Sequence, residues 1–178
     1  MRLTLVVLAL AVGCTAVPVE GDPAAGLRRA WEQPMLAPGA TCPVSTTTAT
    51  PDPDTAPVLG GGPAGPITSA RVEYYAPSEG NLLKTLDWGA QKVAWAVDPT
   101  VTEPVLVRGR RIDAPGRLGF DDPVVRELLL DPVTDASPGG WRQYPSLTRV
   151  RAPGCYAYQV DLSLGSHTIV VRAVGPVV

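Results

Sequence analysis

Alternating apolar and polar residues mark strands along the second half of the chain. Residues 71–75 and 91–97 each place apolar side chains at every second position. Successive side chains of a strand point to opposite faces, so both segments are predicted to be half-buried strands. The residues expected to face the core are Val72, Tyr74, Val93, Trp95 and Val97.

The C-terminal stretch predicts a β-hairpin. Pro153-Gly154 turns the chain into residues 155–162, and Gly165-Ser166 turns it into residues 167–174. A Pro-Gly turn followed by alternating Tyr and Val resembles the last two strands of immunoglobulin-like modules. That resemblance implies an antiparallel β-sandwich in which buried tyrosine rings bond through their hydroxyls to backbone. The inward residues are expected to be Tyr156, Tyr158, Val160, Leu162, Ile169, Val171 and Ala173, with Arg172 in water.

A third strand is expected over residues 105–113. Under strict alternation, Val105 and Val107 cannot share a face with Ile112. We therefore expect Gly109 to form a bulge that shifts the register.

Residues 122–131 combine two signals. Asp122-Pro123 is typical of a helix start, whereas the apolar run VVRELLL also suits a buried strand. We favour the strand and keep a short helix as the alternative.

The N-terminus has the layout of an export signal. Met1 and Arg2 supply positive charge, residues 3–12 form an unbroken apolar run, and Gly13 precedes Cys14. Ten residues of helix span roughly 15 Å, about half of a bilayer's hydrocarbon core, so the run is too short for a membrane span. Residues 10–14 resemble a bacterial lipobox, which implies removal of residues 1–13 and a lipid on Cys14.

The alternative is ordinary cleavage after Ala16, where small residues also stand at the required spacing. The cysteine count favours lipidation, because the chain has three cysteines and acylation uses one of them. Under either processing route, Cys42 and Cys155 remain. Acylation would hold the mature protein on the outer face of a bacterial membrane.

Composition divides the mature chain into a lipid-anchored tether, residues 14–65, and a β-sandwich domain, residues 66–178. Asp22 followed by Pro23 predicts a short helix over residues 23–33 that Pro34 ends. Residues 37–65 are rich in Pro, Thr and Gly and have few apolar side chains, so they predict a disordered spacer.

Overall composition agrees with an exported globular protein. The chain has 45% hydrophobic and 18% charged residues, a net charge of −2, 20 prolines and 18 glycines. That many prolines and glycines disfavour long helices. A nucleic-acid partner is not expected, because it requires a strongly basic face.

Four short motifs resemble those of a group of small bacterial secreted proteins and lipoproteins. The motifs are CPVS at 42–45, GRRIDAP at 109–115, GGWRQYPS at 139–146 and APGCYAYQVD at 152–161. The resemblance covers residues 42–174 and implies a disulfide between Cys42 and Cys155, which suits an exported protein. It carries over no catalytic residues. Two reduced thiols are the alternative, and two cysteines are too few ligands for zinc.

Candidate catalytic and metal-binding groups are sparse, and we predict no cofactor and no metal. His167 stands beside Ser166 without a second base, so a surface histidine is favoured over a Ser-His-Asp site. Asp52 and Asp54 are too few for a calcium loop. We expect Asp121 and Asp122 to cap a turn or helix. The arginines Arg108, Arg110 and Arg111 are expected on the solvated face of a strand and at its bulge, with an anion site as the alternative.

Trp141 and Tyr144 are the best candidates for contact with a ligand or partner. They stand in a loop-like stretch, GGWRQYP, where rings can form a platform for a sugar or a protein side chain. The alternative is that the rings close one end of the domain. We therefore expect a non-catalytic surface module that binds a protein or a glycan or serves a structural role, with an envelope hydrolase as the alternative.

Overall fold

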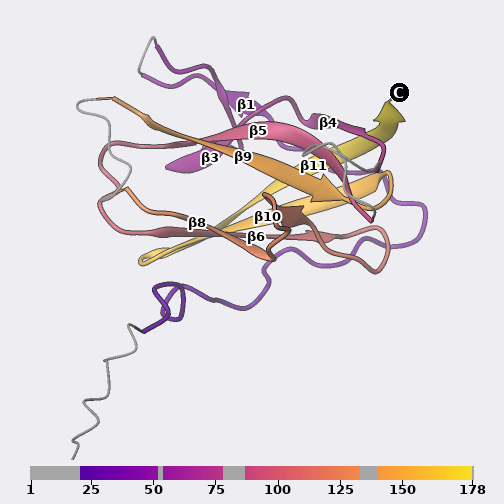
Figure 1. The fold of residues 1–178 in the computed structure, drawn as a ribbon, viewed down its shortest axis with the longest axis horizontal. Helices are drawn as coiled ribbons and strands as arrows, with labels where there is room; N and C mark the ends of the chain where they lie inside the picture. The colour runs from indigo at the N-terminus through magenta and orange to yellow at the C-terminus, as the bar shows by residue number, and fades with distance from the viewer. Residues whose placement is uncertain (1–20, 52–53, 78–86, 133–139, 178) are drawn as a thin grey trace, which may run out of the picture.

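The computed structural model describes residues 21–51, 54–77, 87–132 and 140–177, and this part of the chain is all-β (Figure 1). Its strands are β1 (Thr47–Thr48), β2 (Val58–Leu59), β3 (Ala64–Ile67), β4 (Arg71–Tyr75), β5 (Gly89–Val97), β6 (Val105–Arg111), β7 (Gly119–Phe120), β8 (Glu127–Leu130), β9 (Arg142–Val150), β10 (Gly154–Leu162) and β11 (Gly165–Val177). The described residues form no helix, and so none that could cross a membrane. The predicted all-β class is confirmed.

The large sheet curls into a nearly closed barrel. Its strands follow the order β7-β9-β5-β4-β11-β10-β6-β8, and β3 pairs with β5 beside β4. An isolated bridge joins Phe120 of β7 to Val125, which precedes β8 in the chain. β4 and β11 pair in parallel and join the two layers seen in Figure 1. Because the layers share one hydrogen-bonded path, the separate sheets of an immunoglobulin-like sandwich are not confirmed.

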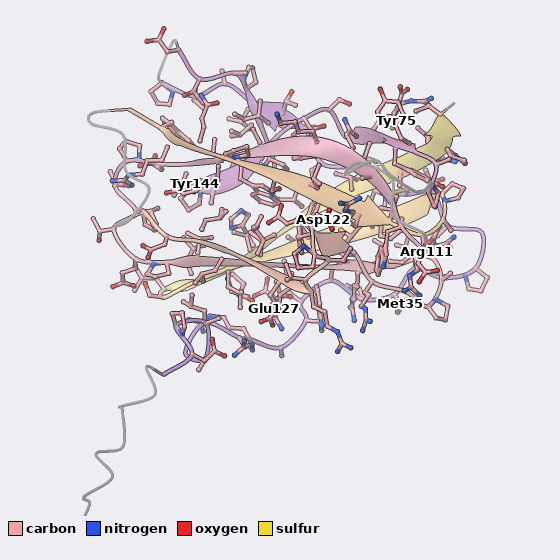
Figure 2. The ribbon with its side chains drawn as sticks, in the orientation of Figure 1. Met35, Tyr75, Arg111, Asp122, Glu127 and Tyr144 are labelled. Atoms are coloured by element: carbon pink, nitrogen blue, oxygen red, sulfur yellow. A yellow bond between two sulfur atoms is a disulfide. The ribbon has the colours of Figure 1, made fainter. Side chains whose placement is uncertain are left out.

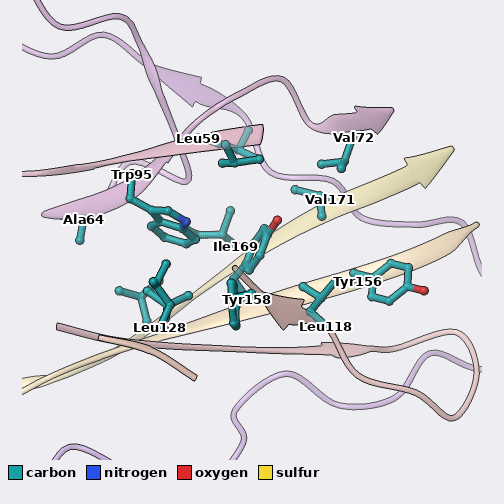
Figure 3. Close-up of a cluster of buried hydrophobic side chains, with 14 of the residues drawn as sticks. Leu59, Ala64, Val72, Trp95, Leu118, Leu128, Tyr156, Tyr158, Ile169 and Val171 are labelled. Atoms are coloured by element: carbon teal, nitrogen blue, oxygen red, sulfur yellow. The ribbon is translucent and has the colours of Figure 1, made fainter. Parts of the chain in front are cut away.

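Aromatic and aliphatic side chains together fill the barrel (Figure 3). Trp95 is fully buried, as predicted, and meets the ring of Tyr158 edge to face with 5.3 Å between centroids. The Tyr158 hydroxyl lies 3.0 Å from Oγ1 of Thr148, so the buried polar atom has a partner. Burial raises the pKa of Tyr158 to about 12. Such packed rings supply much of the apolar area that drives folding.

The C-terminal hairpin is confirmed. β10 and β11 pair in unbroken antiparallel register from Gly154 and Ala173 to Leu162 and Gly165. The inward residues of the prediction are buried or partly buried, and Arg172 is exposed. The Tyr156 hydroxyl donates to the Ala152 carbonyl at 2.7 Å, as expected of a ring at the edge of the core.

The bulge expected at Gly109 is wrong. β6 pairs with β10 without a register shift, and alternation continues to Ile112. Ile112 faces outward, where it packs with Cys155 in a second apolar cluster, while Val107 faces the barrel core. Gly109 has a different role, because a Cβ there would lie 2.4 Å from the Leu118 side chain.

The second half of residues 122–131 is a strand, as favoured. β8 pairs with β6, and Leu128 and Leu130 lie in the barrel core. The polar start is a turn rather than a helix. Asp121 has a positive φ of 53°, and its carboxylate accepts the Leu147 N–H at 2.9 Å. The carboxylate of Asp121 therefore bonds to β9 and not to an N–H of its own turn, so the expected cap at Asp121 and Asp122 stays a prediction.

The helix expected over residues 23–33 is wrong. Asp22 accepts the Ala24 N–H, but only a turn follows, and the chain then runs extended along the outer face of β10. We call residues 22–36 the strap. Gly26 disfavours a helix. Ala24 and Leu27 of the strap pack on Leu106 of β6.

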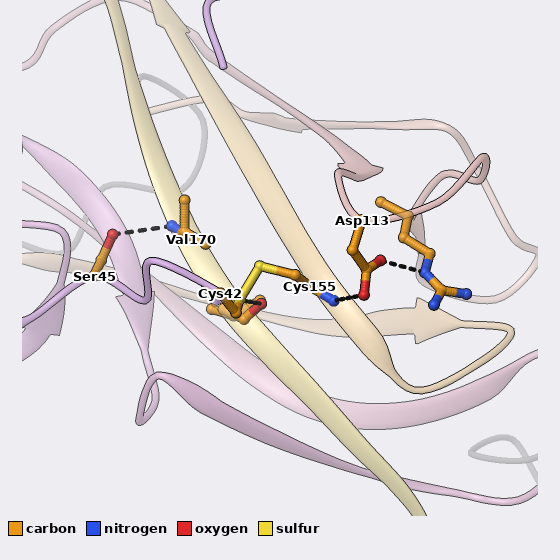
Figure 4. Close-up of a disulfide and its surroundings, with 7 residues drawn as sticks. Cys42, Ser45, Asp113, Cys155 and Val170 are labelled. Atoms are coloured by element: carbon orange, nitrogen blue, oxygen red, sulfur yellow. Dashed lines mark hydrogen bonds and ion pairs between the residues drawn. A yellow bond between two sulfur atoms is a disulfide. The ribbon is translucent and has the colours of Figure 1, made fainter. Parts of the chain in front are cut away.

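Residues 37–65 are not a disordered spacer in their described part. Cys42 and Cys155 form the disulfide that the family resemblance implied, with their Cα atoms 5.6 Å apart (Figure 4). Ser45 exchanges two hydrogen bonds with Val170 of β11. The predicted boundary at residue 65 falls inside β3. These polar residues are ordered by contacts with the sheet, which composition does not show.

Candidate functional site

The candidate site lies where three loops meet at one end of the barrel, which we call the hairpin end. The loops are the β10–β11 turn, residues 98–104 between β5 and β6, and residues 60–63 before β3. The turn and the other two loops enclose a cavity of about 530 Å³, whose wall includes Val101, Pro104 and Leu164. The cavity is mainly apolar, with Glu103 and His167 among its polar wall residues.

His167 is partly buried and belongs to the cavity wall, so the expected surface histidine is wrong. Its Nε2 lies 2.8 Å from the Ala64 carbonyl oxygen. A Cβ on Gly62 would lie 2.5 Å from the same ring nitrogen, which shows how closely the backbone covers the imidazole. Burial lowers the pKa of His167, opposed by the hydrogen bond to Ala64 and by the carboxylates of Glu32 and Asp161. The ring is therefore neutral at pH 7.

Ser166 directs its hydroxyl away from a catalytic arrangement. Its Oγ donates to Oδ1 of Asp161 at 2.6 Å, and Asp161 is fully buried. In a serine nucleophile the hydroxyl would donate to a histidine ring. Ser166 and His167 therefore share a cavity without forming a nucleophile and base pair in this structure.

Trp141 lines a second cavity at the same end. This cavity, about 300 Å³, also includes Thr48 and Asp98, and it shares Gly62 and Pro63 with the first. Trp141 is partly buried and precedes β9 directly. We call this space the Trp141 cavity.

The loop that contributes Asp98 to the Trp141 cavity is held by hydrogen bonds. Arg142 donates to the Val101 carbonyl at 2.8 Å and so holds the loop 98–104 against β9. Within that loop, Oδ1 of Asp98 accepts the Thr100 N–H at 2.8 Å and the Thr100 hydroxyl at 2.6 Å. Trp141, two threonines and Asp98 therefore border one small concave surface.

The structure separates the two aromatic residues that were expected to form a platform. Tyr144 is only 8% exposed and packs in the barrel core, beside its register partner Trp95. Trp141 stays at the surface cavity. β9 begins at Arg142, so alternation within the strand turns Tyr144 inward. For Tyr144 the alternative, a ring that closes the domain, is the better description.

The arginines of β6 are not a solvated face. The guanidinium groups of Arg108 and Arg110 lie 5.0 and 4.8 Å from the ring centre of Trp31 in the strap. Arg108 also pairs with Asp161, and Arg111 pairs with Asp113 at 2.6 Å. The alternation of β6 places Arg108 and Arg110 on one outer face, but nothing in the local sequence points to Trp31.

The remaining candidates carry no site in the described residues. Among these residues, no three His, Cys, Asp or Glu side chains gather as metal ligands. Asp54 is described and has an interaction partner. Asp52 and Cys14 lie outside the described residues. Lipidation of Cys14 therefore stays a prediction.

Comparison with known proteins gives one structural likeness to report. No protein-family model matches the chain, and no curated protein matches it. A crystal structure described as a "putative lipoprotein from Bacillus anthracis" is similar at a TM-score of 0.49 and 9% sequence identity, over 76% of this chain and 88% of that one. The functional assignment therefore rests on the geometry of the hairpin end.

Proposed function

We propose that this protein is an exported bacterial lipoprotein, anchored through an acylated Cys14, whose barrel is a non-catalytic module that binds a glycan or a protein. The observation that carries the binding role is the Trp141 cavity, where an indole lies beside Thr48 and Asp98. Of the two ligand classes, a glycan fits these groups better.

A glycan ligand fits the chemistry of this cavity. The apolar face of a sugar ring can stack on an indole, which offers a large contact area and few rotamers to freeze. Hydroxyl and carboxylate groups beside the ring can exchange hydrogen bonds with sugar hydroxyls. The loop is held by Arg142, so little ordering cost falls on binding.

Two features support export and anchoring. The apolar run of residues 3–12 and the small residue before Cys14 have the layout of a lipoprotein signal. The disulfide between Cys42 and Cys155 is at home in an oxidising compartment outside the cytoplasm. Measuring the intact mass of membrane-extracted protein, wild type against Cys14→Ser, tests the anchor: a chain that starts at Cys14 and carries a diacylglycerol is expected only in wild type.

The binding role is tested by titrating soluble fragments of bacterial cell-wall glycan against the protein and following tryptophan fluorescence. Trp141→Ala is expected to weaken binding by about tenfold or more, since a stacked ring is worth at least about 1.4 kcal/mol. Tyr75→Ala is the control, because Tyr75 is an exposed aromatic residue and lies at the opposite end of the barrel from Tyr144 (Figure 2). Tyr144 belongs to β9, the strand that Trp141 directly precedes. Equal affinities in wild type and Trp141→Ala would refute a glycan site here.

An envelope hydrolase is the second candidate, and the cavity shared by His167, Ser166 and Glu103 favours it. Against it stands the Ser166 hydroxyl, which donates to Asp161. Release of new reducing ends from the same glycan fragments by wild type, and its loss in His167→Gln, would support this candidate. Absence of release while Trp141-dependent binding persists would support the binding module.

A further inference from the structure

We infer that the barrel docks on the lipid bilayer through the β10–β11 turn, with Leu164 in contact with the membrane. This inference rests on the proposed anchoring through Cys14 and names the surface that the anchored domain turns toward the membrane. Leu164 is 99% exposed at the tip of the β10–β11 turn. Single exposed apolar side chains are common on protein surfaces, but Leu164 adjoins the apolar wall of the cavity and extends it to the tip of the turn.

The strap fixes where the anchored chain leaves the barrel. Nη2 of Arg29 donates to the carbonyl oxygens of Leu162 and Ser163, at 3.2 and 2.6 Å. Ala24 and Leu27 pack on Leu106 near the start of β6, which is the same end. Figure 1 shows the indigo start of the described chain beside the yellow β10–β11 turn.

The length of chain before the strap limits which end can face the membrane. Cys14 and Asp22 are 8 residues apart (22 − 14), so they can be at most about 29 Å apart when fully extended. β10 has 9 residues and runs about 30 Å along the barrel. The opposite end could reach the bilayer only if the whole linker ran taut along the barrel. The hairpin end is therefore the end that an anchor at Cys14 holds near the lipid.

The hairpin end also has suitable chemistry for a bilayer. Val101, Pro104 and Leu162 border Leu164 around the apolar cavity. The exposed charges of Arg29 and Glu103 have opposite signs, so apolar contact rather than net charge carries the docking. A lipid anchor keeps the barrel near the membrane, at an effective concentration in the millimolar range. A contact that is too weak to hold a free protein on the membrane can therefore orient an anchored one. Burial of one leucine raises the ratio of docked to undocked orientations by roughly tenfold or more.

The test places a fluorescent reporter at two positions of the full, lipidated chain in vesicles of phosphatidylcholine and phosphatidylglycerol. Ser163→Cys puts the reporter beside Leu164, and Pro115→Cys puts it on an exposed loop at the opposite end of the barrel. Intact mass confirms the lipid on Cys14 and an intact Cys42–Cys155 bond before labelling. Quenching by lipids with a nitroxide headgroup is then measured.

We expect the reporter at 163 to be quenched more strongly than the reporter at 115. Leu164→Asp should reduce quenching at 163 to the level seen at 115, and its circular dichroism should equal that of wild type because residue 164 is exposed. A lipidated chain with equal quenching at both positions, or one whose quenching ignores Leu164→Asp, overturns the docking and leaves the anchor intact. A mature chain without lipid overturns both.

Discussion

The guanidinium of Arg108 holds the fully buried carboxylate of Asp161, with Nε 3.0 Å and Nη2 2.5 Å from Oδ2. The other carboxylate oxygen accepts from Gln159 at 2.9 Å and from Ser166 at 2.6 Å. Nη2 of Arg108 also donates to the backbone of Arg29 in the strap. One buried carboxylate therefore joins β6, β10, the hairpin end and the strap.

Arg108→Ala is expected to lower the free energy of unfolding by about 3–5 kcal/mol, because it leaves the Asp161 charge buried without its cation. Urea unfolding followed by fluorescence measures the change. Arg172→Ala is the control: Arg172 is exposed on β11, and its loss should cost less than about 0.5 kcal/mol. Similar midpoints for the two variants would contradict a structural role for the Arg108–Asp161 pair.

Loss of the disulfide should destabilise the protein by about 2–5 kcal/mol, because the bond closes a loop with a sequence separation of 113 residues and so restricts the unfolded chain. Comparing wild type with Cys42→Ser/Cys155→Ser by urea unfolding gives the difference. Reductant should shift the wild-type midpoint toward that of the double variant. The double variant itself should not respond to reductant, and if it does, the shift in wild type has another cause.

Trp31→Ala should loosen the strap without unfolding the barrel. The change removes two cation–π contacts, each worth about 0.5–2 kcal/mol. Amide hydrogen exchange reports the effect at Glu32, whose N–H donates to Oε1 of Gln159 at 2.9 Å. Exchange there should become faster, while the Ile169 amide in the core stays protected.

Met35→Ala serves as the matched control for the strap. Met35 lies in the same segment and is 48% exposed, so its truncation removes an apolar side chain from the surface of the strap. Exchange at Glu32 should remain as in wild type. If Met35→Ala and Trp31→Ala accelerate it equally, the arginine contacts are not what holds the strap.

Local alternation predicted the parts of the fold that depend on one strand and its neighbour. The inward Trp95, the outward Arg172 and the β10–β11 hairpin follow from a period of two residues and two turn signals. The same rule could have placed Tyr144 in the core. It was missed because the start of β9 at Arg142 is not marked by a turn residue directly before it.

The strap and the wall of the cavity could not be predicted in this way. Nε2 of Gln159 donates to the Ala30 carbonyl across 129 positions of sequence, and His167 meets Ala64 across 103. Such contacts depend on how the barrel closes, which composition does not encode. Residues 37–65 look disordered by composition, yet the disulfide and the Ser45 hydrogen bonds repay the entropy of ordering their described part.

The burial of His167 should make stability depend on pH in a defined window. The pKa of His167 is lowered in the folded state from its ordinary value of 6.5, chiefly by burial. The unfolded chain therefore binds a proton more readily than the folded one, so protonation of His167 favours unfolding. Above pH 6.5 the imidazole is neutral in both states, and the contribution of His167 to stability is fully present. It is lost as the pH falls from 6.5 toward the lowered pKa of the folded state.

His167→Gln separates this effect from other acid-sensitive groups, because an amide can still donate to the Ala64 carbonyl but does not titrate. Urea midpoints measured from roughly pH 7 to pH 5 should fall in wild type and stay flatter in His167→Gln. Asp113 has a lowered pKa, with its bonds to Arg111 and to the Cys155 N–H outweighing burial, so its contribution is lost only below its ordinary value of 3.8. Both proteins should therefore lose stability together below about pH 4. Parallel curves between pH 7 and pH 5 would show that His167 titrates as it does in the unfolded chain.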